Sequence, residues 1–211
     1  MGVTERKQRE REQRQQLLLD AAQRLFVEQG FEKVSMRNIA EATEYSATAV
    51  YHYFKDKNAL LYALQNRAFE HLAQQAAPVG EIAEPVARLR ALGYLYLRFA
   101  AEHPELFELM FLMTNPMEAV QAQDGHVAWT SGRAAFDCMV QVIQYGIDAG
   151  VFPHSDAELV ALMAWAQLHG LAALALRKRL LIFPEARRAV MLEEAMELFI
   201  QLISKGHSSS R

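Results

Sequence analysis

Two short helical segments lie close together between Ser35 and Lys57, and they constrain the fold more than any other part of the chain. Ser35 and Ser46 each precede a run of helix-compatible residues. Serine is a favoured N-cap because its hydroxyl accepts a hydrogen bond from a backbone N–H of the first turn. The spacing predicts helices over about 35–43 and 46–54, joined by a short turn. Such a pair fits the helix-turn-helix unit, in which the second helix enters the major groove of DNA.

The helical repeat divides the second of these helices into two faces. One face is expected to pack against the first helix and consists of Ala49, Val50 and Phe54. The opposite face would lie toward a groove and consists of Ala47, Thr48, Tyr51 and Lys55, with His52 and Tyr53 at its margins as further candidate DNA contacts. Small side chains at the start of the helix permit close approach to base edges, where alanine and threonine can contact a thymine methyl group.

Other candidate DNA contacts surround this face. Tyr51 and Tyr53 offer hydroxyls to phosphates, Arg37 lies near the start of the first helix, and Lys57 adds positive charge at the start of the next one. A tyrosine-rich helix is also typical of a helical core, and an isolated basic residue is usually a solvated charge. The residues alone leave both interpretations open.

Residues from about Leu17 to Leu64 resemble the DNA-binding domain of TetR-family transcriptional regulators. The matching pieces are AAQRLFVEQGFEKVSMRNIAEA and VYHYFKDKNALL. The resemblance implies a set of contacts: Ser35 and Arg37 to the DNA backbone, Ala47 and Thr48 to base edges, Tyr51 and Tyr53 to DNA, and Lys57 to phosphate. One departure lies in the turn, where Glu44-Tyr45 replaces the glycine and apolar residue common in the family.

Composition limits the compartment and the kind of DNA binding. The 211 residues are 52% hydrophobic and 22% charged, with a net charge of −3, which is ordinary for a soluble globular protein. Residues 1–76 carry 11 Lys and Arg against 10 Asp and Glu, while residues 77–211 carry 11 against 15. This asymmetry favours a focused DNA-binding patch near the N-terminus. The single cysteine, the polar N-terminus and the absence of an apolar run of about 18 residues predict a cytoplasmic protein without a membrane span.

Helical periodicity and caps predict an all-α chain of about nine helices, over about 13–29, 35–43, 46–54, 56–76, 85–102, 104–113, 126–149, 155–179 and 184–204. Residues 77–84 and 114–125 are the expected breaks, and Ser155 to Glu158 matches a capping box. The expected domains are a polar arm (1–14), the helix-turn-helix domain (15–62), a ligand-binding and dimerisation domain (63–204) and a disordered tail (205–211). The arm is either solvated or reaches DNA phosphate or the minor groove.

The last two predicted helices, about 155–179 and 184–204, carry apolar residues around much of their circumference. A helix of this kind is central to a large core or buried in a partner, and the size of this half favours a homodimer with two-fold symmetry. A dimer also suits a palindromic operator, because two recognition helices must reach half-sites about 34–36 Å apart or a multiple of that spacing.

Aromatic and methionine side chains in the second half predict either ordinary core or a pocket for a small hydrophobic or aromatic effector. The candidates are Phe99, Phe107, Met110, Phe111, Trp129, Phe136, Met139, Met163, Trp165 and His169. The segment WAQLHGL resembles the Trp-His-Gly motif of one C-terminal subclass of TetR-like regulators. His169 follows Trp165 by one helical turn, so it shares a face with it, either as a ligand contact or as a hydrogen-bonded structural residue.

The sequence contains no phosphate-binding glycine loop, no HExxH or GxSxG motif and no cysteine pair, so neither an enzyme nor a bound cofactor or metal is expected. The resemblance therefore predicts a homodimeric transcriptional regulator that binds an operator in double-stranded DNA, with repression relieved by the effector. Two alternatives are retained: an all-helical enzyme or cofactor carrier, and an adaptor on the same fold that binds only protein.

Overall fold

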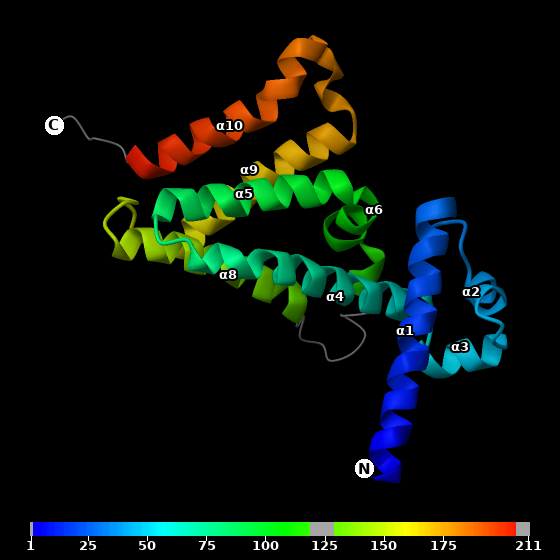
Figure 1. Cartoon of the computed structure of the whole chain (residues 1–211). Coiled ribbons are helices and arrows are strands. Elements are labelled where there is room, and N and C mark those ends of the chain that lie inside the picture. The colour runs from blue at the N-terminus through cyan, green and yellow to red at the C-terminus, as the bar shows by residue number, and fades with distance from the viewer. Residues whose placement is uncertain (1, 119–128, 206–211) are drawn as a thin grey trace. The chain divides into compact units, whose positions relative to one another are not determined.

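The computed structural model describes residues 2–118 and 129–205, and helices make up most of both ranges (Figure 1). The α-helices are α1 (Val3–Gln29), α2 (Met36–Ala42), α3 (Ala47–Tyr53), α4 (Lys57–Ala76), α5 (Pro85–Glu102), α6 (Pro104–Phe107), α8 (Thr130–Asp148), α9 (Ala157–Leu176) and α10 (Glu185–Lys205). Three shorter helices are the 3-10 helices η1 (Ala77–Glu81) and η3 (Arg179–Ile182) and the π-helix η2 (Glu108–Leu112). No strand occurs in the described ranges, and the predicted all-α class is confirmed.

The chain divides into two compact units. The N-terminal unit comprises Met1–Ala68 together with Glu108–Trp129, and the C-terminal unit comprises Phe69–Phe107 together with Thr130–Arg211. Helix α4 begins in the first unit and ends in the second. The chain therefore leaves the N-terminal unit, returns to it and leaves again.

A single apolar core holds the N-terminal unit together. Its most buried members come from α1, α2, α3, α4 and η2: Leu18, Ala22, Phe26, Ile39, Val50, Leu60, Leu61, Leu64 and Leu109. Arg67 of α4 adds a polar link to α1, since it forms an ion pair of 2.5 Å with Asp20 and donates a hydrogen bond to Gln23. The core thus fixes the two short helices of the predicted DNA-binding unit against two long ones.

Helix α1 begins about ten residues before its predicted start near Gln13. The sequence prediction of a loose arm over 1–14 was wrong in this respect, because Arg, Lys, Glu and Gln are good helix formers even without an apolar stripe. Pairs one turn apart support the extension: Arg6 and Glu10 form an ion pair of 2.9 Å, and Gln8 donates a 2.8 Å hydrogen bond to Glu12.

Serine caps begin both helices of the helix-turn-helix unit, as predicted. The Ser35 hydroxyl accepts a hydrogen bond from the Asn38 N–H, and the Asn38 side chain accepts one from the Ser35 N–H in return. The Ser46 hydroxyl accepts from the Ala49 N–H. Between the helices Glu44 adopts φ 58°, the left-handed conformation that glycine provides at this turn in related sequences.

The π-helix η2 is held by one buried side chain of α4. Gln65 has no exposed surface, and its amide N–H groups donate to the carbonyls of Leu109 and Met110 at 3.1 Å and 3.2 Å. Its amide oxygen accepts from the Trp129 indole N–H at 3.1 Å. A continuous α-helix over 104–113 was therefore the wrong prediction for its second half, where the backbone widens into a π-turn.

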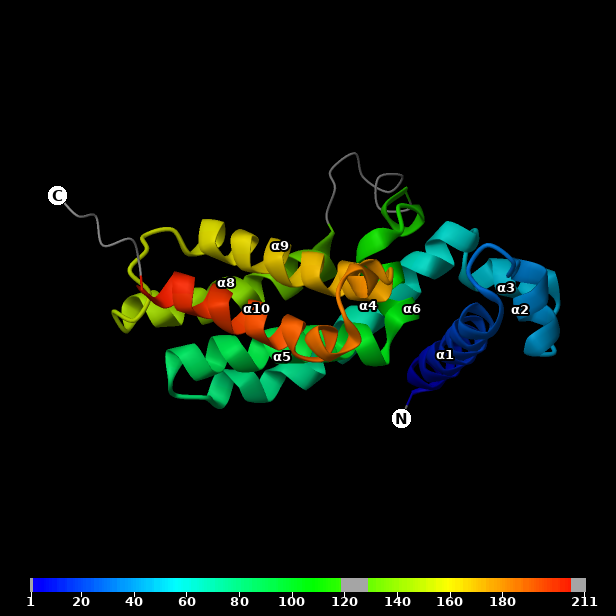
Figure 2. The same cartoon turned by 90° about the horizontal axis from the view of Figure 1, so that it is seen from above.

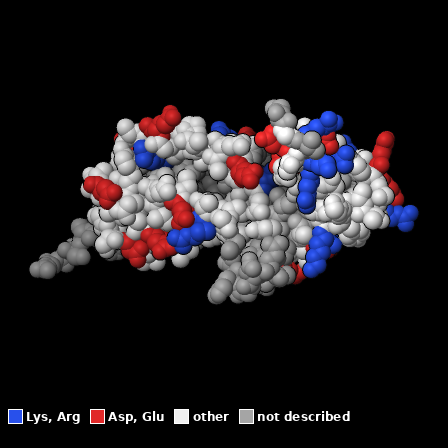
Figure 3. Space-filling view, turned by 90° about the horizontal axis from the view of Figure 1, so that it is seen from below, with Lys and Arg blue, Asp and Glu red and all other residues white. Residues whose placement is uncertain are grey.

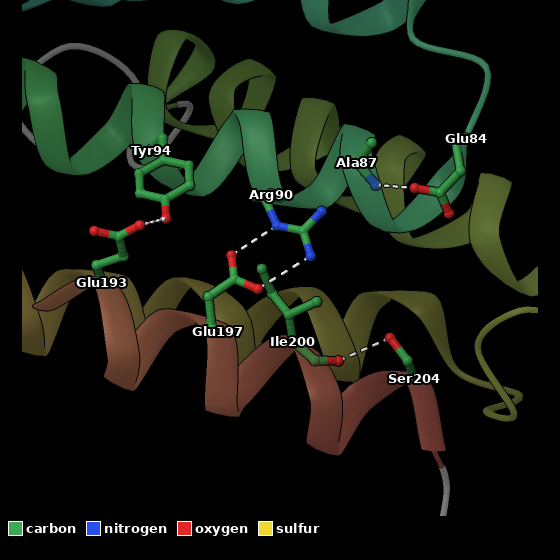
Figure 4. Close-up of polar contacts among 8 residues, drawn as sticks. All are labelled: Glu84, Ala87, Arg90, Tyr94, Glu193, Glu197, Ile200 and Ser204. Atoms are coloured by element: carbon green, nitrogen blue, oxygen red, sulfur yellow. Dashed lines mark hydrogen bonds and ion pairs between the residues drawn. The ribbon is translucent and has the colours of Figure 1, made fainter.

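The C-terminal unit is a bundle in which α5 packs against α8, α9 and α10, while α9 also packs against α8 and α10 (Figure 2). Gly93 of α5 permits this approach, because an added Cβ would lie 2.7 Å from the sulfur of Met196 on α10. A bidentate pair joins the same helices, with Arg90 donating to both carboxylate oxygens of Glu197 at 2.6 Å and 3.0 Å (Figure 4). Tyr94 donates to Glu193 one turn further along.

The remaining boundaries lie close to the predicted ones, with three corrections. Asp156, rather than Ser155, caps α9, and its carboxylate accepts from the Leu159 N–H. The break over 77–84 contains the 3-10 helix η1, and residues 115–118 within the predicted 114–125 loop are helical. Residues 119–128 and the predicted tail after Lys205 lie outside the described residues.

Among the described helices, α9 alone is long and apolar enough to pass a length-and-composition test for a membrane span. The expectation that no segment would reach this length counted only uninterrupted apolar residues, and α9 is interrupted by Glu158, Gln167 and His169. Core helices of water-soluble proteins pass the same test. The inner face of α9 is buried through Val160, Ala161 and Leu168, while its outer face leaves Leu159, Leu162 and Met163 exposed.

Candidate nucleic-acid interface

The two faces of α3 differ as the sequence predicts. Val50 and the following Phe54 are buried in the core of the N-terminal unit, so one side of the helix is fixed. On the other side lie exposed residues: Ala47, Thr48, Tyr51, His52 and Lys55. Tyr51 is 52% exposed although its ring is large and apolar, and a surface ring of this kind is available to a partner. The exposed face combines small side chains at its start with hydroxyl, imidazole and ammonium groups further along.

Tyr53 occupies a different place from Tyr51. It is half-buried, packs against the core of the unit and stacks edge-on against His52 with ring centroids 5.6 Å apart. The Tyr53 phenol lies close enough to Arg14 of α1 to raise the pKa of the guanidinium. Tyr53 therefore joins α3 to α1, which makes it a positioning residue in addition to any contact with DNA.

The other predicted contacts are placed around the same helices. Arg37 is exposed on α2 and pairs with Glu41 at 3.1 Å, a surface ion pair weak enough to exchange for phosphate. The ammonium of Lys57 donates to the Phe31 carbonyl, which leaves two of its three N–H donors available. Ser35 is exposed but its hydroxyl is engaged in the α2 cap.

Sequence reasoning did not single out three basic residues of α1: Lys7, Arg11 and Arg14. Their spacing of four and three residues continues the stripe that begins with the buried Leu18, so they lie on the side of α1 that faces the helix-turn-helix. The spacing can be seen in the sequence once residues 3–14 are recognised as a helix. Because a polar arm was predicted over 1–14, no helical face was assigned to these residues.

A network of aromatic side chains lies in the C-terminal unit. The Tyr96 hydroxyl is 3.2 Å from Nδ1 of His169 and accepts a hydrogen bond from Trp165. Phe107 stacks on His169 with centroids 5.4 Å apart, and Phe136 contacts Trp165 at 6.0 Å. Burial lowers the pKa of His169 and raises that of Tyr96, so neutral groups fill this network.

The Trp-His spacing of the WAQLHGL segment thus has a physical explanation. Trp165 and His169, one helical turn apart on α9, both reach the oxygen of Tyr96 on α5. Gly170 has no neighbour within 4 Å of an added Cβ among the described residues. The motif serves the internal packing of α5 and α9, and membership of the Trp-His-Gly subclass stays a prediction.

The candidate pocket residues are distributed over both units. Phe99, Phe107, Phe136, Met139, Trp165 and His169 belong to the C-terminal unit, where Phe99, Phe107 and Met139 are buried. Met110, Phe111 and Trp129 belong to the N-terminal unit, where Trp129 bonds to Gln65. Met163 is 57% exposed on the outer face of α9.

Known proteins identify the family. Residues 18–64 match the family described as bacterial regulatory proteins, tetR family, and residues 89–199 match the family described as tetracyclin repressor-like, C-terminal domain. The second match alone covers more than half of the chain. The chain is a member of the TetR family. The TetR family is one of helix-turn-helix transcriptional regulators rather than enzymes.

Individual relatives agree with this family assignment. The TetR-family chain is 38% identical over 69 residues to the HTH-type transcriptional repressor Rv1474c of Mycobacterium tuberculosis, covering 33% of this chain and 37% of that protein. It is 25% identical over 128 residues to the HTH-type transcriptional repressor AcnR of Corynebacterium efficiens, covering 60% of this chain and 62% of that one. The chain thus spans less than two thirds of the length of both curated relatives.

Solved structures match over nearly the whole chain. A Rhodococcus sp. RHA1 protein of unknown function has a TM-score of 0.74 at 27% identity, covering 90% of this chain and 95% of that one. The fatty acid degradation regulator FadR of Bacillus halodurans has a TM-score of 0.68 at 17% identity, covering 92% and 96%. The second likeness shows a shared fold alone.

Proposed function

We propose that this TetR-family regulator is a repressor that binds its operator as a homodimer and is released by a small hydrophobic or aromatic effector. The observation that carries the proposal is α3, whose inner face is buried by Val50 while Ala47, Thr48 and Tyr51 remain exposed on the other. Ala47 and Thr48 read base edges, and Tyr51 and His52 contact DNA beside them. Ser35, Arg37, Tyr53 and Lys57 position the unit on the backbone. Relatives named as repressors favour repression over activation.

The proposed dimer forms through α9 and α10. Both helices leave large apolar side chains exposed in the single chain: Leu159, Leu162, Met163 and Leu174 on α9, and Val190, Leu198 and Leu202 on α10. A contiguous apolar surface of this kind is uncommon on a monomer in water. A two-fold interface covers the same surface on both copies and supplies the two recognition helices that a palindromic operator requires.

The proposed effector site lies at the aromatic network of the C-terminal unit. Phe107, Phe136 and Trp165 supply aromatic surface, while Tyr96 and His169 supply the polar groups that could orient a ligand. Effector and operator then favour different conformations of the dimer, with α4 as the continuous helix between the two units. Thermodynamic linkage requires that each weaken the binding of the other by the same factor.

Operator binding is tested by fluorescence anisotropy with duplexes from the gene's own upstream region and a random duplex as control. The unaltered protein is expected to prefer one upstream duplex by about a thousandfold or more. Tyr51→Ala should abolish most of that preference while leaving the melting temperature nearly unchanged, because the side chain is half exposed. Tyr51→Phe removes the hydroxyl and keeps the ring, so it separates the contributions of the two groups to DNA binding.

Two results contradict the proposal. Equal affinity for operator and random duplex, with a steep salt dependence, indicates charge-driven contact only and favours the adaptor alternative. A large loss of thermal stability in Tyr51→Ala places that residue in the core.

Effector release is tested with the same operator: a ligand that binds the protein without lowering operator affinity eliminates the coupling mechanism. Because the proposed site of action is the operator in DNA, the protein is expected in the cytoplasm.

A further inference from the structure

The N-terminal extension of α1 carries a basic stripe formed by Lys7, Arg11 and Arg14. These residues lie four and three positions apart and continue the row that includes Leu18, which is buried against the other helices of the N-terminal unit. At 1.5 Å per residue, Lys7 lies about 16 Å along the helix axis from Leu18. The stripe thus lies on the side of α1 that packs in the core of the N-terminal unit, but it extends past that core.

Arg14, at the inner end of this stripe, lies close enough to Tyr53 of α3 for the phenol to raise the pKa of the guanidinium. Figure 1 shows the N-terminal end of α1 projecting past α3 within the same unit. In the face drawn in Figure 3, Lys and Arg side chains gather over the N-terminal unit. The extension therefore places positive charge alongside the recognition helix, beyond the part of the chain that forms the helix-turn-helix.

The charges of the extension differ in their partners. Outside the stripe, Arg6 pairs with Glu10 and Arg9 contacts the Glu5 carbonyl. Within the described residues, neither Lys7 nor Arg11 forms an ion pair or side-chain hydrogen bond. Glu10 attracts Arg14, but it is already engaged by Arg6. Two cations thus remain uncompensated on the side that faces the helix-turn-helix.

We propose that the basic stripe of α1 binds the DNA phosphate backbone outside the half-site that α3 reads, so that each protomer occupies a longer segment of duplex than its helix-turn-helix covers. The inference rests on the proposed operator binding by α3. With α3 in the major groove, phosphates border the groove on both sides, and a helix that projects past α3 meets one of these borders. The contact adds affinity at all sequences and does not read bases.

The test compares two double variants with the same loss of charge on the same helix. Lys7→Gln with Arg11→Gln removes the uncompensated pair of the stripe, whereas Arg6→Gln with Arg9→Gln removes two cations of the same helix that lie outside the stripe. Glutamine preserves helix propensity in both. Operator binding is measured by anisotropy at several salt concentrations, and circular dichroism checks that helix content is equal.

The stripe variant is expected to bind operator and random duplex about tenfold or more weakly at low salt, and to reduce the salt slope by up to about four per dimer, one for each lost contact. The affinity of the Arg6→Gln, Arg9→Gln variant should stay within about twofold of that of the unaltered protein. Trimming the duplex outside the operator should weaken the unaltered protein and leave the stripe variant nearly unaffected, since it no longer uses those phosphates.

The outcomes separate the inference from the proposed function. Specific binding by the unaltered protein, with equal behaviour of the two variants, overturns the stripe contact and leaves the operator reading by α3 intact. Equal losses in both variants indicate a general effect of net charge and also overturn it. Absence of specific binding by the unaltered protein overturns the proposed function, and the inference with it.

Discussion

Glu44 is one of two described non-glycine residues with a positive φ, the other being Lys178. With φ 58° it takes the left-handed region in the turn between α2 and α3, where its Cβ is crowded by backbone. Hydrogen bonds hold the turn in place, including the one from the Tyr45 N–H to the Ala40 carbonyl at 3.0 Å. The resemblance suggested a glycine at this turn, and the structure keeps the geometry with a different residue.

Replacing Glu44 by glycine should therefore stabilise the protein by about 0.5–1 kcal/mol, because relief of backbone strain exceeds the added entropy of the unfolded chain. For a chain of this length the melting temperature should rise by about 1–4 °C. Thermal unfolding followed by circular dichroism measures the effect. Glu44→Ala, which retains a Cβ, is the matched control, and an equal rise in both variants would attribute the effect to loss of charge.

His169 links protonation to stability. Burial lowers its pKa below the usual value near 6.5, so the folded protein resists protonation there more than the unfolded chain does. Its contribution to stability is complete above about pH 6.5 and declines as the pH falls below that value, because the unfolded chain then takes up the proton first.

Chemical denaturation between pH 7.5 and about 5 should show the free energy of unfolding falling toward acid, with a smaller slope in His169→Gln than in the unaltered protein. The other histidines are common to both proteins, so the difference in slope isolates this residue. A slope that does not change in the variant would contradict a neutral His169 in the Tyr96 network.

At the scale of the elements, caps and turns made the best predictions. Pro85 at the start of α5 and His103-Pro104 after it predicted that helix to the residue, and Ser35 and Ser46 placed α2 and α3 within one. These signals are local, since each depends on a hydrogen bond or a restricted φ angle within one turn. The amphipathic division of α3 was predicted for the same reason.

Features that depend on tertiary packing were not predicted. The π-turn of η2 spans five residues, too few for a change in helical repeat to register in the sequence. The link between Arg14 and Tyr53 joins residues far apart in the chain, and the division of the pocket candidates between two units depends on where residues 108–118 pack. The Trp165–Tyr96–His169 network could not be predicted without knowing that α5 lies beside α9.

The hydrogen bonds that Gln65 of α4 forms with η2 and Trp129 should be costly to remove. Gln65→Met keeps the approximate volume of the side chain but leaves two carbonyls and the Trp129 indole N–H without this partner in a buried site. We expect a loss of about 2–4 kcal/mol in the free energy of unfolding. Gln74→Met, an exposed position on the same helix, controls for the change in composition. Loss of less than about 1 kcal/mol would mean that water replaces the amide.

At the scale of the whole molecule, the proposed dimer depends on the exposed apolar surfaces of α9 and α10. Met163→Glu introduces a charge on the outer face of α9, and a two-fold interface would bury two such charges close together. We expect the variant to become monomeric at micromolar concentration and to bind operator at least about tenfold more weakly, as measured by analytical ultracentrifugation and anisotropy.

Gln74→Glu on the exposed side of α4 provides the matched control, because it adds the same charge on a helix other than α9 and α10. It should leave both mass and affinity unchanged. Dissociation of both variants, or of neither, would require a different dimer surface.

The return of the chain to the N-terminal unit has a consequence for how such regulators can be recombined. Leu109 of η2 is 1% exposed and belongs to the same core as Leu64 of α4, and Gln65 bonds to the same segment. The helix-turn-helix unit is consequently not an independent domain that ends within α4. A chimaera that fuses residues 1–68 to a foreign sensor would carry an uncovered apolar patch, whereas one that also transplants the segment from Glu108 to Trp129 would preserve the native packing.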